Sequence, residues 1–210
     1  EGLHEIVDPS GVLLVKRDGE IPPGIAVAIV YEGSRILLVE IQALTVPAKA
    51  GITRVYSDRI DASRVARIAA VMEKQTGLRF SDQDIYINVA GGVRISETGI
   101  DLALAAALYS ARTGQALPSG AAMAGELSLA GEIRPVRQMS KRARTAQALG
   151  FLHVFGPREG LAREAASKEA PARKGSTKDS FQKEGQLADW RAVDSLKAAI
   201  RALMGLMGAE

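Results

Sequence analysis

The chain has 210 residues, a formal net charge of +3 and 47% hydrophobic residues, enough for one α/β domain with a sizeable core or for two small ones. It has no cysteine, which excludes disulfides, thiolate catalysis and a cysteine-ligated zinc, and its two histidines make a poor metal set. No apolar run approaches the roughly 20 residues that span a bilayer, and no signal peptide is visible. We therefore expect a cytoplasmic protein without a membrane or metal role. Because the sequence begins with Glu rather than Met, we also expect a piece of a longer chain.

The first third of the chain predicts antiparallel sheet. Residues 11–17 and 22–46 are rich in Val, Ile and Leu, and the EGS turn at 32–34 predicts a hairpin. After these strands, Asp61 is expected to cap a helix that runs to about residue 75 and that Gly77 ends.

The middle of the chain predicts a strand followed by a buried helix. Residues 83–95 alternate between polar and apolar and break at Gly91 and Gly92, where a backbone kink is expected. Residues 100–113 are apolar on all faces, so the helix they form should lie at the centre of the core, and Gly114 should close it.

The entry into this helix reads SETGID, which raises the question of whether a hydroxyl there is a nucleophile or a helix cap. We favour Ser96 or Thr98 as the N-cap. Asp101, one turn into the helix, is expected to be half-buried and to stabilise the positive end of the helix dipole.

The last part of the chain predicts two short strands at 121–136 around a turn at Ala130 and Gly131, then a basic helix over 138–150 and a strand at 151–156. Residues 157–185 are polar and predict a flexible insertion. Helical periodicity resumes over Trp190–Met204, so a C-terminal helix is expected within 186–205. This order of elements predicts a single domain over residues 1–210 of the mixed α/β class, with helices packed on the sheet.

Phosphate-binding loops of the GxxxxGK[ST] type are absent from the sequence, so we do not expect a P-loop ATPase in this segment. The pair Gly91 and Gly92 favours a bulge over a ligand cradle, because glycine in a strand usually serves the backbone.

Three strings, LLVEIQALT, DQDIYINVAGGVRI followed by SETGIDLALAAAL, and GELSLAGEIRPV, closely resemble the C-terminal Lon-protease-like domain of the bacterial RadA (Sms) DNA repair family. The resemblance covers residues 2 to about 156. It implies a Lon peptidase domain-like, ribosomal-protein-type βαβ fold in a hexameric ring. It also implies a branch-migration motor active in stress response, repair and recombination, with RecA as a further partner. ATP, Mg and Zn are then expected only in N-terminal domains outside this sequence, and no cofactor is expected here.

Active Lon peptidases use a Ser-Lys dyad, and the resemblance places Gly99 at the serine position and Ser140 at the lysine position. Lys141 is one residue away, about 100° around the helix. A rescue pairing of Ser96 with Lys141 requires a shift on both elements. We therefore expect no catalytic residue and no enzyme activity in this segment, with an active Ser-Lys peptidase as an alternative.

The basic residues predict a DNA-backbone site that reads no sequence, on single- or double-stranded DNA. Arg54, Arg64 and Arg94 stand at element boundaries and match basic positions of the family pattern. Further candidates are Arg59, Arg67, Arg137, Lys141 and Arg144. Because only 4% of the residues are aromatic, base stacking is not expected. The other alternative is an oligomerisation module without DNA contact.

Overall fold

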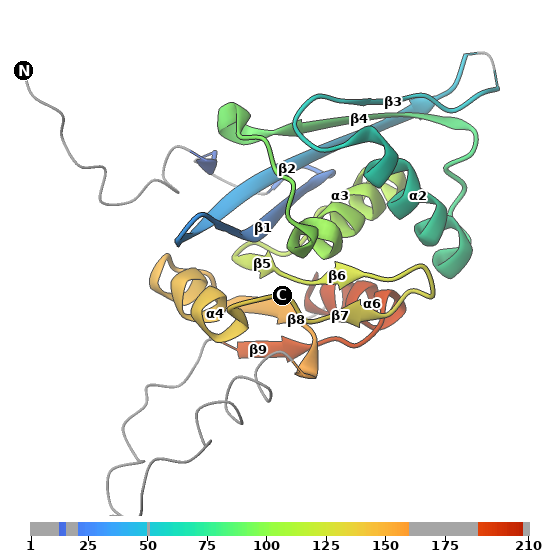
Figure 1. Ribbon diagram of the computed structural model, residues 1–210. Helices are drawn as coiled ribbons and strands as arrows, with labels where there is room; N and C mark the ends of the chain where they lie inside the picture. Colours follow the sequence, from blue (N-terminus) through green and yellow to red (C-terminus); the bar gives the residue numbers. More distant parts are fainter. Residues whose placement is uncertain (1–12, 16–20, 50, 160–188, 208–210) are drawn as a thin grey trace, which may run out of the picture.

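The computed structural model describes residues 13–15, 21–49, 51–159 and 189–207. A seven-stranded sheet with the order β3-β4-β2-β1-β5-β8-β9 forms its centre (Figure 1). The pairs β1–β2 and β2–β4 are antiparallel, and the other four pairs are parallel. Strands β6 and β7 form a separate antiparallel pair. The fold is therefore mixed α/β, as the sequence predicts.

The strands are β1 (Ile25–Glu32), β2 (Arg35–Pro47), β3 (Val55–Ser57), β4 (Gln83–Val89), β5 (Ala121–Met123), β6 (Glu126–Leu127), β7 (Ile133–Arg134), β8 (His153–Gly156) and β9 (Asp189–Ala192). The helices are α2 (Ala62–Thr76), α3 (Asp101–Thr113), α4 (Met139–Ala148) and α6 (Leu196–Met207), with short 3-10 turns η1 (Ala90–Gly92) and η2 (Thr98–Ile100).

Two hydrophobic clusters cover the two faces of the sheet. Because side chains alternate along a strand, Ala26, Ala28 and Val30 of β1 face the cluster that contains α2, α3 and α6. Val27 and Ile29 face the other cluster, which contains the apolar side of α4. Figure 1 shows α2 and α3 together on one side of the sheet. Helix α3 is thus buried between the sheet and its neighbouring helices, which explains why it is apolar all round.

Local signals placed several element ends correctly. The carboxylate of Asp61 accepts a hydrogen bond from Arg64 N at the start of α2, and Gly77 ends this helix in the left-handed conformation at φ 78°. Gly114 closes α3 in the same way. The β1–β2 hairpin turns at residues 33 and 34, as predicted.

Other expectations were wrong. Leu13 lies in a helical turn, so no strand spans the described part of residues 11–17. Trp190 lies in β9, paired with Val154 of β8, and the C-terminal helix begins only at Leu196. Local periodicity does not reveal this, because β9 exists through its pairing with a strand far away in sequence. Between residues 121 and 136 there are three strands, since β5 joins the main sheet before the β6–β7 pair.

The predicted insertion at 157–185 lies mostly outside the described residues. The described segment that follows it joins the same structure, because Leu196, Ala199 and Leu203 of α6 are buried in the cluster that contains α2 and α3. No helix within the described ranges has both the length and the hydrophobicity needed to cross a membrane.

Candidate functional site at the start of α3

Just before α3 lies Gly99, the position at which the resemblance to Lon peptidases would place a nucleophilic serine. Gly99 is buried in η2, and its carbonyl accepts a hydrogen bond from Gly125 N at 2.9 Å. A Cβ atom at this position would lie 3.2 Å from the Glu97 carboxyl carbon and 3.3 Å from Arg142 Nη1. The space beside Gly99 is therefore already filled by these two charged side chains.

Arg142 of α4 is fully buried. Its guanidinium forms an ion pair with Glu97 and also donates to Ile29 O at 2.5 Å and to Arg137 O at 2.8 Å. Glu97 in turn accepts from Tyr31 N at 2.7 Å. Arg142 has no exposed surface and the Glu97 side chain is 19% exposed, and we call the two the buried ion pair. It joins α4, the end of β1 and the segment before α3, and each charge has several partners, as buried charges require.

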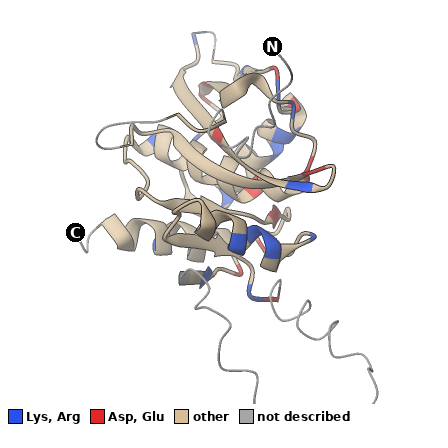
Figure 2. Ribbon diagram, turned by 90° about the vertical axis from the view of Figure 1, so that its left-hand side faces the viewer, with Lys and Arg blue, Asp and Glu red and all other residues tan. Residues whose placement is uncertain are grey.

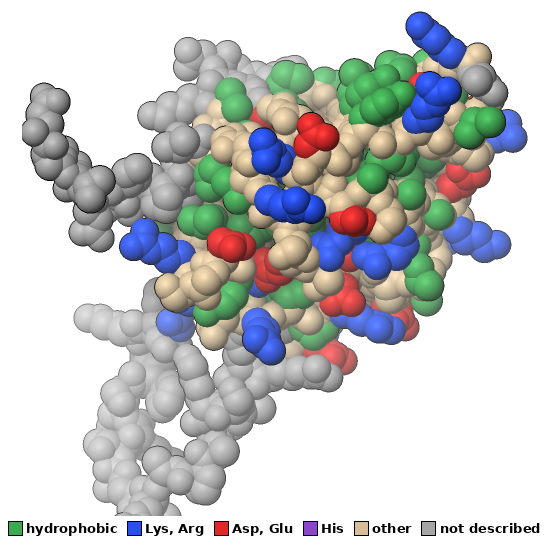
Figure 3. Space-filling view, turned by 45° about the horizontal axis from the view of Figure 1, so that its top comes forward, with side chains coloured by type: hydrophobic (Ala, Val, Ile, Leu, Met, Phe, Trp, Pro, Cys, Tyr) green, Lys and Arg blue, Asp and Glu red, His purple; other side chains and the backbone are tan. Residues whose placement is uncertain are grey.

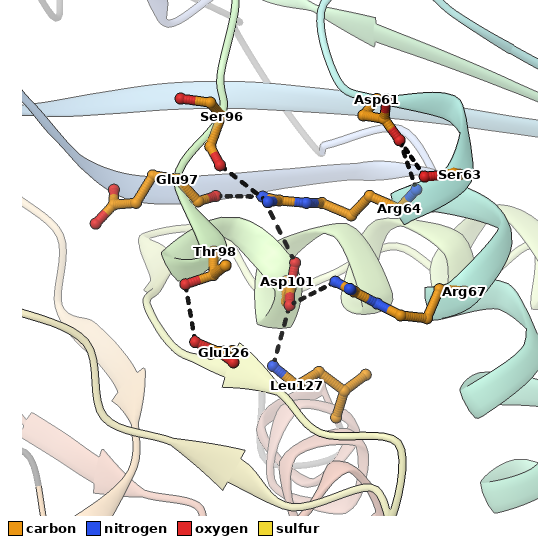
Figure 4. A network of polar contacts seen from close by, with 10 residues as sticks. All are labelled: Asp61, Ser63, Arg64, Arg67, Ser96, Glu97, Thr98, Asp101, Glu126 and Leu127. Carbon is orange, nitrogen blue, oxygen red and sulfur yellow. Dashed lines mark hydrogen bonds and ion pairs between the residues drawn. The ribbon is translucent and has the colours of Figure 1, made fainter.

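Asp101, in the first turn of α3, is also fully buried rather than half-buried. Figure 4 shows Arg64 and Arg67 reaching toward it from α2. The nearest guanidinium nitrogens lie 4.0 Å and 3.5 Å from its two carboxylate oxygens, and Leu127 N donates to Oδ2 at 3.2 Å. Oδ1 has no hydrogen-bond partner.

Burial raises the pKa of Asp101 to about 6, against the hydrogen bond from Leu127 and the two arginine charges, which lower it. Burial prevails because neither arginine comes close enough to donate to this carboxylate, while the side chain has lost all contact with water. Asp101 is therefore an acid that changes charge near neutral pH.

The predicted caps were wrong. Ile100 precedes α3, and no side chain caps the helix. Thr98 instead donates its hydroxyl to Glu126 of β6 at 2.9 Å, and the Ser96 carbonyl accepts from Arg64 at 2.9 Å (Figure 4). The turn η2 changes the direction of the chain before α3, so these hydroxyls do not reach its first amides.

The predicted dyad positions lie on different elements. Ser140 is half-buried in the first turn of α4. The neighbouring Lys141 is exposed, and its amine donates to Ser34 O in the β1–β2 turn at 3.2 Å.

The three principal DNA-binding candidates are not brought to one point. Arg54 precedes β3 and lies beside the start of β4, since its amide donates to Asp84 at 3.0 Å. Arg94 follows the other end of β4, so the two lie about 20 Å apart along the seven-residue strand. Both are exposed. Arg64 donates to the carbonyls of Ser96 and Glu97, and its side chain is only 16% exposed, which leaves it little capacity for an external phosphate.

The further candidates form two groups. Arg59 is exposed and adjoins Arg94, because Ile95 N donates to Arg59 O at 2.9 Å. Arg67 forms an ion pair with Asp101, and its side chain is 43% exposed. Exposed Arg137, Lys141 and Arg144 belong to α4 and the residues before it. Figure 2, in which α4 faces the viewer, shows basic residues over much of this helix.

Charges of both signs mix on the face seen in Figure 3. Figure 3 shows Lys and Arg side chains interspersed with Asp and Glu on one face, with hydrophobic groups between them. A single continuous basic patch is not visible on this face.

Sequence reasoning missed the buried ion pair and the stack formed by Tyr56 and Tyr86, whose ring centroids lie 4.5 Å apart. The buried ion pair had a signal in the sequence, the acid Glu97 three residues before the predicted helix at 100–113. The tyrosine stack had a signal as well, because the alternation of side chains in β3 and β4 places Tyr56 and Tyr86 on the exposed face.

The fold and this site define a mixed α/β domain whose central helix begins over a network of buried charges. The chain belongs to the family described as Subunit ChlI of Mg-chelatase, whose model matches residues 39–160, more than half of the 210 residues.

Among the similar proteins are several named DNA repair protein RadA. The protein from Treponema pallidum is 56% identical over 156 residues, which are 74% of this chain and 34% of the relative. Those from Brucella abortus and Escherichia coli are 46% and 38% identical over 74% and 79% of this chain, and 33% and 36% of their own lengths. The chain thus spans about a third of the relatives it matches.

Two expectations are corrected by these comparisons: that this segment is not an enzyme and that it has no cofactor of its own. The family that matches this region is named for a subunit of an enzyme, Mg-chelatase. The resemblance of the three strings to the RadA family placed ATP and Mg in other domains of a larger protein. The family model instead matches residues 39–160 of this chain, which contradicts that expectation.

The described ranges contain no group of three or more His, Cys, Asp or Glu side chains that would hold a metal ion. The sequence lacks the GxxxxGK[ST] pattern of a phosphate loop. The described residues therefore do not fit a built magnesium site, and the sequence does not fit a P-loop.

Proposed function

We propose that this domain is part of a RadA-type DNA repair protein, in which it holds the DNA backbone without reading sequence and supports assembly of a hexameric ring. Relatives named DNA repair protein RadA, at up to 56% identity over three quarters of the chain, support the repair role. The match to Subunit ChlI of Mg-chelatase supports an ATPase-related role for the protein. We include in the proposal a Lon-like fold, a single domain over residues 1–210 and a working partnership with the recombinase RecA.

The observation that carries DNA binding is the pair Arg59 and Arg94. Both are exposed, and the hydrogen bond from Ile95 N to Arg59 O holds their backbones side by side. Each exposed guanidinium group can bond a phosphate, because arginine bonds phosphate oxygens in a bidentate manner. Arg54, at the far end of β4, would reach a phosphate several nucleotides away. Arg64 serves the site indirectly by fixing the segment before α3.

Replacing Arg59 or Arg94 by alanine is expected to weaken binding to duplexes of any sequence alike. Each lost phosphate contact should flatten the dependence of log affinity on log salt concentration by about 0.9. The measurement is fluorescence anisotropy of two unrelated labelled duplexes across a salt series. Arg201→Ala, an exposed arginine of α6, is the matched control and should leave the slope unchanged.

Wild-type slopes in Arg54→Ala, Arg59→Ala and Arg94→Ala would contradict this site. If neutralising Arg137, Lys141 and Arg144 then abolished binding, the DNA would lie on the α4 face. Unequal losses on the two duplexes would show that the domain reads sequence.

Ring assembly is a separate prediction. At +3 per copy, six copies would carry roughly +18, enough for an appreciable field around a central opening. Sedimentation of the chain at low salt should detect a hexamer. A monomer at high protein concentration would contradict ring assembly by this chain alone. Any ring would then depend on contacts made by other domains of the protein.

A further inference from the structure

Two tyrosines form an exposed pair on the face of the sheet that carries α4. Tyr56 of β3 and Tyr86 of β4 are cross-strand neighbours, and their rings are stacked with an interplanar angle of 8°. They are 41% and 39% exposed, and Leu44 of β2, in register with Tyr86, is 56% exposed. Three large side chains thus form one row across three strands.

The geometry of the pair leaves one aromatic face open. The centroid separation of 4.5 Å is close to the spacing of neighbouring strands, about 4.8 Å. The rings therefore stand upright on the sheet and stack along the direction in which strand follows strand. Because β3 is the last strand of the sheet in the described residues, the outer face of Tyr56 points past the sheet edge, with no further strand to cover it.

Polar groups surround this row. A shallow hollow of about 510 Å³ lies over it and is lined in part by Gln42, Asn88 and Ser57. The Asn88 amide donates to Gln42 at 2.9 Å, and Gln42 donates to Glu40 at 2.6 Å. Amide groups held in this way are rigid hydrogen-bonding partners, suited to the edge of a flat polar ring.

Arg54 supplies a cation at the rim. It is two residues before Tyr56, and a hydrogen bond to the Tyr56 side chain raises the pKa of Arg54 above its ordinary value. Arg59 lies just beyond the other end of β3. Of the acids nearby, Asp84 is buried and bonded to Arg54 N, while Asp58 is exposed. The row therefore lies between two exposed cations.

We propose that Tyr56 is a base-stacking residue for single-stranded DNA, with Arg54 holding the phosphate next to the stacked base. This rests on the proposed function, DNA binding by this domain, and names the form of DNA. A base of a duplex already has neighbours on both faces, whereas an unpaired base can extend the Tyr86–Tyr56 stack. The low aromatic content predicted no stacking, but a single exposed pair at a sheet edge is sufficient.

The test compares the affinity of the 210-residue chain for three labelled ligands: an oligothymidylate, an abasic strand of equal length and a duplex. The wild-type chain should prefer the oligothymidylate to the abasic strand. Tyr56→Ala should weaken oligothymidylate binding about 5- to 150-fold, the range for one stacked base, and remove this preference. Tyr56→Phe keeps the aromatic ring and should retain most of the preference for the oligothymidylate. Arg54→Ala should weaken both single strands.

A second readout does not depend on affinity. An oligonucleotide with 5-iododeoxyuridine should, on illumination, cross-link to a peptide that contains Tyr56. Circular dichroism of Tyr56→Ala checks that the variant folds. If the variant does not fold, cross-linking to the wild-type chain still tests the proposal.

The outcomes separate the two proposals. Equal losses on all three ligands, or wild-type affinity of Tyr56→Ala together with no cross-link at Tyr56, overturn stacking while leaving backbone binding intact. Absence of binding to every ligand at low salt overturns both. A changed oligomeric state in Tyr56→Ala with unchanged DNA affinity shows that the row is an interface between copies of the chain, which also overturns stacking.

Discussion

Replacing Glu97 by alanine should lower the free energy of unfolding by about 3 to 5 kcal/mol, the cost of leaving one partner of a buried ion pair without its counter-charge. Arg142 would keep its bonds to Ile29 O and Arg137 O but lose the carboxylate that neutralises it, in a position with no access to water. Tyr31 N would lose its acceptor as well. Urea unfolding with linear extrapolation measures the loss.

A surface pair provides the matched control. Glu132 and Arg134 also form a close pair, at 3.0 Å, but both side chains are 59% exposed. Glu132→Ala should therefore cost little, because water screens the pair in the native protein. The double variant Glu97→Leu with Arg142→Met should be more stable than Glu97→Ala, since no charge is then left buried. Equal losses in Glu97→Ala and Glu132→Ala would show that the buried ion pair contributes no more than a surface pair.

Asp101 is expected to make the protein less stable as the pH rises. Its pKa is about 6 in the folded protein and about 3.9 in the unfolded chain, so between these values the folded state holds a proton that the unfolded state has lost. The stability that this proton gives is present below about pH 4 and lost as the pH passes 6. The full change is about 3 kcal/mol, from a difference of about 2 pKa units.

Asp101→Asn removes this titration. The variant should gain stability relative to the wild type as the pH is raised from about 4 to 7, because the neutral amide does not pay the cost of a buried charge. Unfolding curves at several pH values measure the difference, with Glu132→Gln as an exposed control. A difference that falls with pH would mean that the attraction of Arg64 and Arg67 outweighs the burial of Asp101.

The stability of the α3 start bears on the proposed DNA site. Arg64 holds the carbonyls of Ser96 and Glu97 and lies beside Asp101, and Arg94 belongs to the same connection between β4 and α3. Loosening this connection should move Arg94 relative to Arg59. Loss of DNA affinity in Arg64→Ala at unchanged salt slope would therefore indicate positioning, whereas a flatter slope would indicate a direct phosphate contact.

Elements whose signals are local can be recognised from the sequence alone. Asp61 and Gly77 mark α2 because a cap and a left-handed glycine act on neighbouring amides, and α3 is recognisable because its side chains are apolar on every face. The strings that resemble RadA pointed to the relatives named DNA repair protein RadA for the same reason: they are contiguous.

Contacts between residues far apart in the sequence become visible only in the folded protein. Glu97 and Arg142 are 45 residues apart, and the packing of α4 on the sheet brings them together. The parallel pairing of β3 with β4 sets Tyr56 against Tyr86, and the same pairing separates Arg54 from Arg94 by the length of β4. Register between strands depends on which faces must be buried together, and this is a property of the whole core that no short stretch of sequence contains.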